Sequence, residues 1–491
     1  MVRQYRAPTA DGAVLAEPSF DALPALVEAN RRSLDRTGVT VGGLPLRELR
    51  ARARREALEL AREYTEGPAF RAGPSAEGPL LLAGHQPELS HPGVWVKNFA
   101  LNGLARKLDG TPLNLVVDND TLKSTALRFP TFRRGDPASV RLESLTFDTF
   151  SGEVPYEDRG TEDAERACAF DSFARRAEPL WSNWGYEPLL RRVWPDAVHH
   201  KPTATIGERF AVMRRDRERA WGCHNLELPV SRLSQTDAFG RFASHVLADL
   251  PRFRSAYNAA IRAYRAANDV RSANHPAPEL ADGEAPFWVR TAKGRRGRAT
   301  AASDVKRLRP RALTLTLFAR LCLGDFFIHG IGGGKYDEVT DAIVRDYFGV
   351  EPPAYQVLSA TIHLPLPAFP STADDLRRAG RRLRDLRWNP QHRLPPERRD
   401  AGVKALVDTH AALAANEPPY ANHAARRERF RALQRVKERL RALVADQVPG
   451  AEAELRRVRS EVGANAILRR RDYAWVLYPE EPLRGFLQRF L

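Results

Sequence analysis

The sequence predicts an α/β protein in which a doubly wound, mostly parallel sheet is followed by a C-terminal helical arm. Three observations support this fold class. Residues 80–117 read as strand, polar turn, helix, turn and strand. A second strand–turn–helix pattern occurs at 326–348, and from about residue 371 the chain becomes charged, Arg-rich and helical. Together these patterns are typical of a Rossmann-like core with an α-helical coiled-coil arm.

The amino-acid composition indicates the general class of protein. The chain has 491 residues, 43% of them hydrophobic and 28% charged, which is typical of a globular protein with two or three domains. The three cysteines, Cys168, Cys223 and Cys322, form no CxxC pair, which argues against a zinc ribbon or a thioredoxin-type site and fits a cytoplasmic protein. No apolar run suggests a signal peptide or a membrane span, so no membrane partner is expected.

The net charge of +16 has three interpretations: nucleic-acid binding, a small anionic substrate, and compositional bias. The abundance of Arg, Ala and Pro is what a GC-rich genome produces without selection for a binding partner. No basic block carries interleaved aromatic residues and no known reader motif occurs, so nucleic acid is a disfavoured partner. We expect a small anionic substrate instead.

The first part of the chain predicts a helical segment and then the core. Residues 1–75 are expected to form an N-terminal helical segment, with helices at 20–34 and 44–64. Residues 76–370 are expected to form the Rossmann-like core with helical insertions. Apolar runs and helical periodicity place its strands at 80–83, 113–117, 139–147, 226–233, 285–291, 326–328 and 356–366. The same criteria place its helices at 94–108, 206–221, 238–267 with a break at Pro251, 310–323 and 339–348.

The last part predicts an arm and a tail. Residues 371–470 are expected to form the arm, with helices at 374–388, 401–415, 421–447 and 451–468. Spacings of three and four residues within it indicate a coiled-coil seam made of Phe430, Leu433, Val436, Leu440 and Leu443, through which a homodimer could form. The tail, 471–491, is apolar enough to dock on the core.

Polar side chains follow the strands at 80–83 and 113–117. Because the carboxyl ends of parallel strands face the ligand crevice, these turns are candidate site segments. His85 could be a general acid or base, or simply a histidine bonded to a loop carbonyl. Asp118 and Asp120 could be a base with its partner, a metal pair or a helix cap; no third ligand is evident, so no metal is predicted. The candidate substrate-binding residues beside them are Gly84, Gln86, Lys97, Asn98 and Asn119.

The glycine-rich stretch at 329–337 is a second candidate. It fails as a Walker motif because His329 stands where the first Gly is required and Tyr336 follows the Lys. It also fails as a dinucleotide fingerprint, whose third Gly falls on Lys335. We expect a tight turn whose backbone N–H groups and lysine bind an anion, with His329 catalytic, against the alternative of a plain turn with a surface lysine. The candidate binding residues are Gly332, Gly333, Gly334, Lys335 and Tyr336.

Three stretches together resemble the cysteine-adding enzymes of bacillithiol biosynthesis (BshC). The residues that carry the resemblance are Gly84–Leu89 with Pro92, Gly93 and Lys97, then Val117–Asp120, then Arg309-Pro310 with the turn at 329–336. The departures are His85 in place of a Gln, Asn119 in place of a His, and Gly334 in place of a Glu. The resemblance covers about half of the chain and implies a Rossmann-like core with a coiled-coil arm.

By resemblance, the reaction is ligation or group transfer that joins a cysteine carboxyl to an amino-sugar conjugate. His85, Asp118, Asp120 and His329 are then the candidate catalytic residues, and Arg309 joins the substrate-binding set. The cofactor is open, with ATP or another nucleotide as candidates. The alternatives are a nucleotide-dependent transferase of nucleotidylyltransferase-like fold, which lacks a second histidine beside His85, and a basic nucleic-acid-binding protein that uses the arm.

Overall fold

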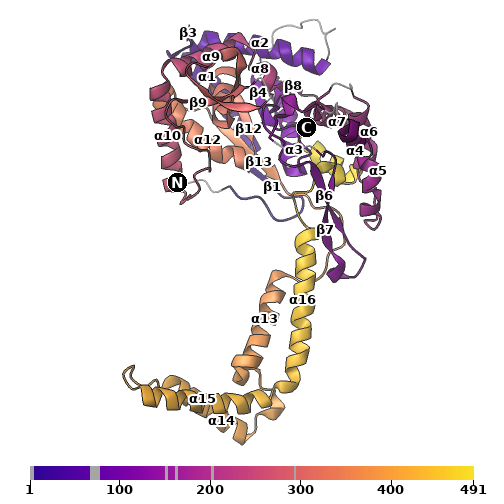
Figure 1. The fold of residues 1–491 in the computed structure, drawn as a ribbon, viewed down its shortest axis with the longest axis vertical. Helices are drawn as coiled ribbons and strands as arrows, with labels where there is room; N and C mark the ends of the chain where they lie inside the picture. The colour runs from indigo at the N-terminus through magenta and orange to yellow at the C-terminus, as the bar shows by residue number, and fades with distance from the viewer. Residues whose placement is uncertain (1–4, 67–77, 150–152, 161–163, 201–203, 292–294) are drawn as a thin grey trace. The chain divides into compact units, whose positions relative to one another are not determined.

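A computed structural model describes residues 5–66, 78–149, 153–160, 164–200, 204–291 and 295–491 (Figure 1). The chain divides into two compact units. The core unit comprises residues 1–129, 144–365 and 471–491, and the helical unit comprises residues 130–143 and 366–470. Each unit is described separately below.

A six-stranded sheet forms the centre of the core unit, and it is mixed but mostly parallel, as the sequence predicts. Its strands lie in the order β1 (Val14–Glu17), β13 (Tyr355–Ala360), β12 (Phe326–His329), β4 (Leu80–His85), β5 (Thr111–Val116) and β8 (Leu226–Pro229). All neighbours are parallel except β1, which pairs antiparallel with β13.

The order of the parallel strands shows that the chain reverses its direction of winding. From β4 it proceeds outward through β5 to β8, and later it returns to the other side of β4 to form β12 and then β13. The reversal therefore falls between β4 and β12, where Leu81 pairs with Phe326 and Ala83 with Ile328. In open parallel sheets, such a switch point opens a crevice at the carboxyl ends of the strands.

Helices cover the sheet and surround it. They are α1 (Leu23–Arg36), α2 (Leu46–Glu66), α3 (Pro92–Lys107), α4 (Ala164–Asp171), α5 (Phe173–Ala177), α6 (Leu190–Val198), α7 (Ile206–Ala220), α8 (Val230–Leu233), α9 (Asp237–Ala248), α10 (Leu250–Ala267), α11 (Ala312–Leu317), α12 (Ile331–Ile343) and α17 (Glu480–Gln488). Two π-helical segments, Phe318–Leu323 and Val344–Phe348, continue α11 and α12. The smaller strands are β2 (Thr40–Val41), β3 (Leu44–Pro45), β6 (Ala126–Thr131), β7 (Arg141–Thr146), and an antiparallel sheet of β9 (Glu284–Arg290), β10 (Arg296–Thr300) and β11 (Leu308–Pro310).

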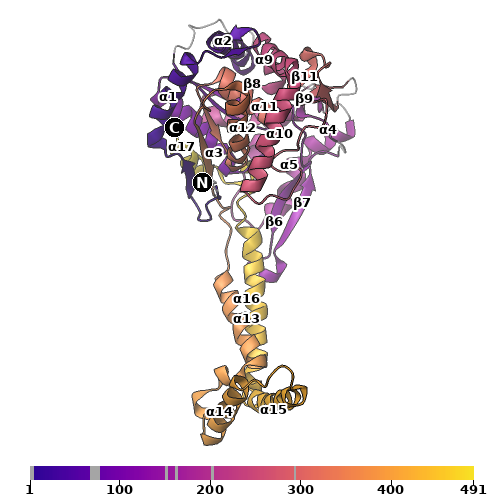
Figure 2. The same ribbon diagram turned by 90° about the vertical axis from the view of Figure 1, so that its left-hand side faces the viewer.

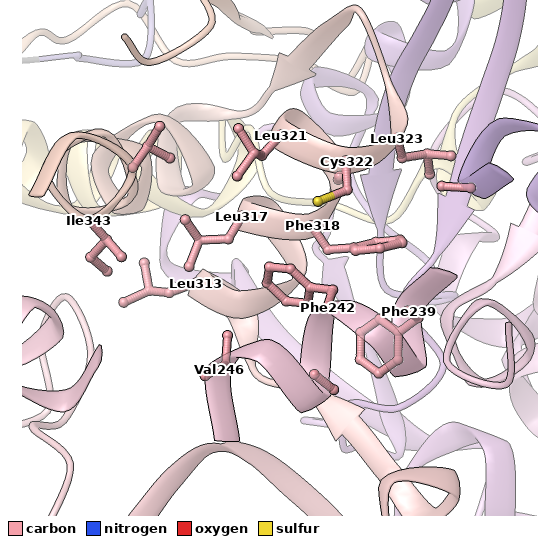
Figure 3. Close-up of a cluster of buried hydrophobic side chains, with 14 of the residues drawn as sticks. Phe239, Phe242, Val246, Leu313, Leu317, Phe318, Leu321, Cys322, Leu323 and Ile343 are labelled. Carbon is pink, nitrogen blue, oxygen red and sulfur yellow. The ribbon is translucent and has the colours of Figure 1, made fainter. Parts of the chain in front are cut away.

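Alternation along β4 explains the layers of the core unit. Leu80 and Leu82 belong to a large buried cluster that includes residues of α2, α9, α10, α11 and α12. Leu81 and Ala83 point the other way because successive strand residues alternate, and α3 packs against that part of the sheet. In the cluster, Phe318 contacts Phe239 edge-on with ring centroids 5.3 Å apart (Figure 3).

The helical unit contains α13 (Ala373–Trp388), α14 (Ala401–Ala415), α15 (His423–Ala442) and α16 (Val448–Leu468). The helices α13 and α16 run side by side, and α14 lies against α15 (Figures 1 and 2). A separate buried cluster, which includes Leu383, Leu386, Val436 and Leu440, holds the unit together.

Most predicted elements are confirmed, and three predictions need correction. The predicted strand at 226–233 ends at Pro229, and α8 takes up its second half. The predicted strand at 356–366 ends at Ala360. In the predicted coiled-coil seam, Phe430 is 59% exposed while Val436 and Leu440 are buried, so the seam does not extend to Phe430. Among the described residues, no helix combines the length and apolarity needed to cross a membrane.

Candidate functional site

The candidate site lies in the core unit, at the carboxyl ends of β4, β5 and β12. His85 is the last residue of β4 and pairs with Val116 at the end of β5. His329 is the last residue of β12, on the other side of β4. The two histidines therefore flank the point where the winding of the sheet reverses.

The His85 side chain remains accessible and holds a defined tautomer. Its Nδ1 lies 3.1 Å from the Gln86 carbonyl oxygen, and its side chain is 29% exposed. Because a carbonyl can only accept, Nδ1 carries the proton and Nε2 keeps a lone pair. Burial, and then the Lys97 cation, hold the pKa of His85 well below its usual value. His85 is thus a neutral imidazole at neutral pH, and its Nε2 is a hydrogen-bond acceptor.

Lys97 projects from α3 and is the buried cation of this region. It is 3% exposed, and its Nζ donates to the Gly84 carbonyl oxygen at 3.3 Å. A methyl group placed on Gly330 would lie 3.9 Å from the same nitrogen, so the ammonium lies beside the start of α12 as well. Burial lowers the pKa of Lys97 to about 8, and Glu88 opposes this shift. Within the described residues, no carboxylate forms a salt bridge with it.

The glycine-rich stretch is a helix start and not the tight turn that the sequence predicts. Gly330 caps α12 in an extended conformation, and the helix begins at Ile331, so Gly332, Gly333 and Gly334 occupy its first turn. None of these glycines has the positive φ that would require a glycine, yet two are closely packed. A Cβ on Gly333 would lie 2.7 Å from His329 Nδ1, and one on Gly334 would lie 2.4 Å from Val357 Cγ2. Close packing thus accounts for two of the glycines.

Because α12 begins at Ile331, the N–H groups available to an anion are those of a helix start and not those of a tight turn. The first N–H groups of a helix have no partner within the helix and carry a partial positive charge. Those of α12 lie at the end of β12, near Lys97. Lys335 and Tyr336 lie farther along the helix and are half-buried, whereas Lys97 lies beside the helix start at Gly330.

His329 is placed inside a buried ion-pair network. Its Nε2 lies 2.5 Å from Asp337 Oδ2, and Arg320 donates to the same oxygen at 2.9 Å. Its ring stacks on Phe327 with centroids 4.0 Å apart. Burial opposes ionisation of Asp337, but His329 and Arg320 hold the pKa of that carboxyl below its usual value. This geometry favours a structural role for His329, fastening α12 to β12, over the catalytic role expected from the sequence.

Three consecutive residues of the turn after β5 form hydrogen bonds with distant parts of the chain. Asp118 accepts hydrogen bonds from the Ser231 backbone N–H at 2.8 Å and from the Ser231 hydroxyl. Burial raises the pKa of Asp118 to about 7, and the hydrogen bonds from Ser231 oppose the shift. The Asn119 amide donates to the Pro310 carbonyl at 2.8 Å. Asp120 accepts from Gln86 at 2.9 Å and from Arg296 at 2.9 Å, which links the turn to the His85 segment.

Two expected binding residues are engaged elsewhere. The Arg309 guanidinium pairs with Glu157 at 2.8 Å and also donates to the Leu308 carbonyl. The Asn98 amide donates to the buried carboxylate of Glu218 at 2.7 Å. These contacts give both side chains a role in holding the fold together.

Sequence reasoning missed several residues that shape the site. Glu88 lies 3.7 Å from His85 Nδ1, and burial raises the pKa of its carboxyl. Ser231 and Arg296 hold Asp118 and Asp120 from positions more than a hundred residues away in the chain. No local sequence pattern links Ser231 and Arg296 to their partners. Glu88 lies only three residues after His85, so its place in the same turn was a usable signal.

The described residues contain no group of three or more His, Cys, Asp or Glu side chains arranged to hold a metal ion. The groups that could hold an anionic ligand are the Lys97 ammonium and the first N–H groups of α12. No known protein-family model matches the chain, and no curated protein is detectably similar in sequence. The function is therefore inferred from the chemistry of the crevice.

Proposed function

We propose that the protein is a ligase or group-transfer enzyme that binds a small anionic substrate in the crevice between the ends of β4 and β12. The observation that carries this proposal is the buried Lys97 ammonium, which has no carboxylate partner among the described residues and lies at the reversal of winding. Burial of an unpaired cation is costly, and a bound anion would offset that cost.

The neighbouring groups support distinct roles. Lys97 and the first N–H groups of α12 bind the anionic group of the substrate. His85 Nε2 carries the lone pair that accepts the proton of the attacking amine or hydroxyl. A bound anion would offset the Lys97 charge, which lowers the pKa of the imidazole, and so strengthen the imidazole as a base. Asp120 and Arg296 act through Gln86, which they hold beside His85, and are positioning residues.

We also propose that the core unit is Rossmann-like and that the helical unit is a coiled-coil arm. The strand order on either side of the β4–β12 reversal supports a Rossmann-like core. The helices α13 and α16 pack against each other, and Leu383, Leu386 and Ala451 are buried in the cluster that they share. This packing supports a coiled-coil arm formed by α13 and α16.

The resemblance to the cysteine-adding enzymes suggests the reaction to test first. Purified protein is incubated with cysteine and glucosaminyl malate, with and without ATP, and the condensed thiol is sought by mass spectrometry. We expect product from the wild-type protein, and a rate about 10²- to 10⁴-fold lower for His85→Ala, the usual contribution of a general base. The control is Lys335→Ala, because Lys335 is only half-buried and lies farther along α12. This variant should retain activity.

A folded protein that gives no product under any of these conditions would exclude this reaction. A panel of phosphorylated and carboxylated metabolites, scored by thermal stabilisation, would then test the broader proposal of an anion-binding crevice. If no anion stabilises the wild-type protein, the crevice is not a substrate site.

A further inference from the structure

The outer face of α15 in the helical unit carries a row of arginines that the proposed enzymatic function does not use. Residues 423–442 contain eight Lys or Arg and only two acidic residues, Glu428 and Glu438. Four of the arginines recur every fourth residue and are exposed: Arg427, Arg431, Arg435 and Arg439, here called the α15 stripe. Residues four apart lie on one helix face, about 6 Å apart along the axis.

The α15 stripe differs from the arginines of α13 and α16. On those helices, Arg382 pairs with Glu454 at 3.0 Å and Arg457 pairs with Glu461 at 2.7 Å, and Arg387 also pairs with Glu452. Among the described residues, no carboxylate lies within ion-pair distance of any arginine of the α15 stripe. Arg384 of α13 and Arg459 of α16 are also exposed and form no ion pair among the described residues, but on α15 four such arginines recur every fourth residue. Compositional bias alone explains abundant arginines, but it does not explain this spacing.

An exposed aromatic side chain lies at the edge of the α15 stripe, beside its first arginine. Phe430 is 59% exposed and follows Arg427 by three residues, next to Arg431. The opposite face of α15 is occupied, since Val436 and Leu440 belong to the buried cluster of the helical unit. An exposed Phe beside Arg427 is unfavourable in water, and it provides a surface on which a base can stack.

We propose that the α15 stripe and Phe430 form a docking surface for single-stranded nucleic acid. Guanidinium groups spaced by one helical turn match successive phosphates of an extended strand and bind them with paired hydrogen bonds. Phe430, at the edge of the α15 stripe beside Arg427, stacks on a base of that strand. An anionic membrane fits less well, because the apolar face that would enter the bilayer is already packed inside the helical unit. This inference is independent of the proposed function.

The test uses the full-length protein and fluorescence anisotropy of a labelled single-stranded oligonucleotide of about twenty nucleotides, at several salt concentrations. The stripe variant is Arg427→Gln/Arg431→Gln/Arg435→Gln. The matched control is Arg381→Gln/Arg384→Gln/Arg459→Gln, which removes the same charge from exposed arginines of α13 and α16. Circular dichroism verifies that both variants are folded.

We expect the stripe variant to bind about tenfold or more weakly, and the slope of log affinity against log salt to fall by about two, at roughly 0.7 per lost phosphate contact. The control should bind within about twofold of the wild type, and Phe430→Ala should weaken binding about fivefold. The inference is overturned if the wild type fails to bind at low salt, or if the control loses as much affinity as the stripe variant. It is also overturned if vesicles of anionic phospholipid bind the protein and the oligonucleotide does not.

Discussion

The junctions that follow β4 and β12 have the same plan, a strand leading into a helix at the same edge of the sheet, but they present different chemistry. Six residues, 86–91, separate β4 from α3. Only Gly330 separates β12 from α12. The longer connection displays side chains such as His85 and Glu88, whereas the shorter one presents the backbone N–H groups of a helix start. Polar side chains are thus concentrated at the β4 junction, and the N–H groups of a helix start lie at the β12 junction.

The histidines at the two strand ends also differ. His85 is partly exposed, and among the described residues its polar contacts are with Gln86 and Glu88 of the following turn. His329 is buried and paired with Asp337, which also holds Arg320. A histidine at a strand end is therefore not evidence for catalysis by itself, since its surroundings decide its role.

The largest effect expected from this comparison is on stability. Asp337→Ala removes the buried carboxylate that pairs with Arg320 and His329, and should lower the free energy of unfolding by about 3–5 kcal/mol. Asp120→Ala, at the other junction, removes a partly exposed pair with Arg296 and should cost no more than about 1 kcal/mol. Urea denaturation followed by circular dichroism measures both. Similar losses for the two variants would show that the junctions do not differ in this way.

A smaller difference in stability is expected between alanine substitutions at two glycines of the first turn of α12, Gly332 and Gly334. A Cβ on Gly334 would lie 2.4 Å from Val357, so Gly334→Ala should destabilise the protein by about 1–3 kcal/mol through overpacking. A Cβ on Gly332 would meet no atom within 4 Å, so Gly332→Ala should stabilise it by up to about 1 kcal/mol. Thermal unfolding of the two variants tests whether the stretch is helical. Strong destabilisation by Gly332→Ala would instead support a turn.

The smallest effect is a dependence of anion affinity on pH. Lys97 is cationic below its pKa of about 8, so the affinity for sulfate, whose own charge is constant in this range, should change little from pH 5.5 to 7 as far as Lys97 is concerned. Above that pKa the ammonium loses its proton, and the affinity should fall by up to about tenfold per pH unit. Lys97→Arg should remove this fall, because a guanidinium stays charged. A transition near pH 6, attributable to His85, would contradict the low pKa of that imidazole.

Sequence periodicity predicted the two strand–helix junctions because both combine a short apolar run with a helix of regular apolar spacing. It missed β1, a short edge strand whose pairing with β13 depends on residues more than three hundred positions away. It merged β8 with α8, since Val230 and Leu233 are apolar and buried whether the segment is strand or helix. Tertiary packing decided these cases.

The candidate site was predictable only in part. The order of strands and polar turns predicted that His85, Gln86 and Lys97 gather at one edge of the sheet. The glycines were interpreted as a turn because glycine favours turns, whereas the structure uses them for close contact with His329 and Val357. Long-range partners such as Ser231 for Asp118 leave no local pattern in the sequence.

The central claim is that Lys97, from the β4 junction, and the start of α12 bind the same anion. The most direct test is thermal stabilisation by phosphate and by malate, compared between Lys97→Met and Lys335→Met. Methionine retains much of the length of lysine and removes its charge, so the fold should persist. The account predicts that Lys97→Met abolishes stabilisation by both anions while Lys335→Met responds as the wild type does. Stabilisation that survives in Lys97→Met and disappears in Lys335→Met would contradict it.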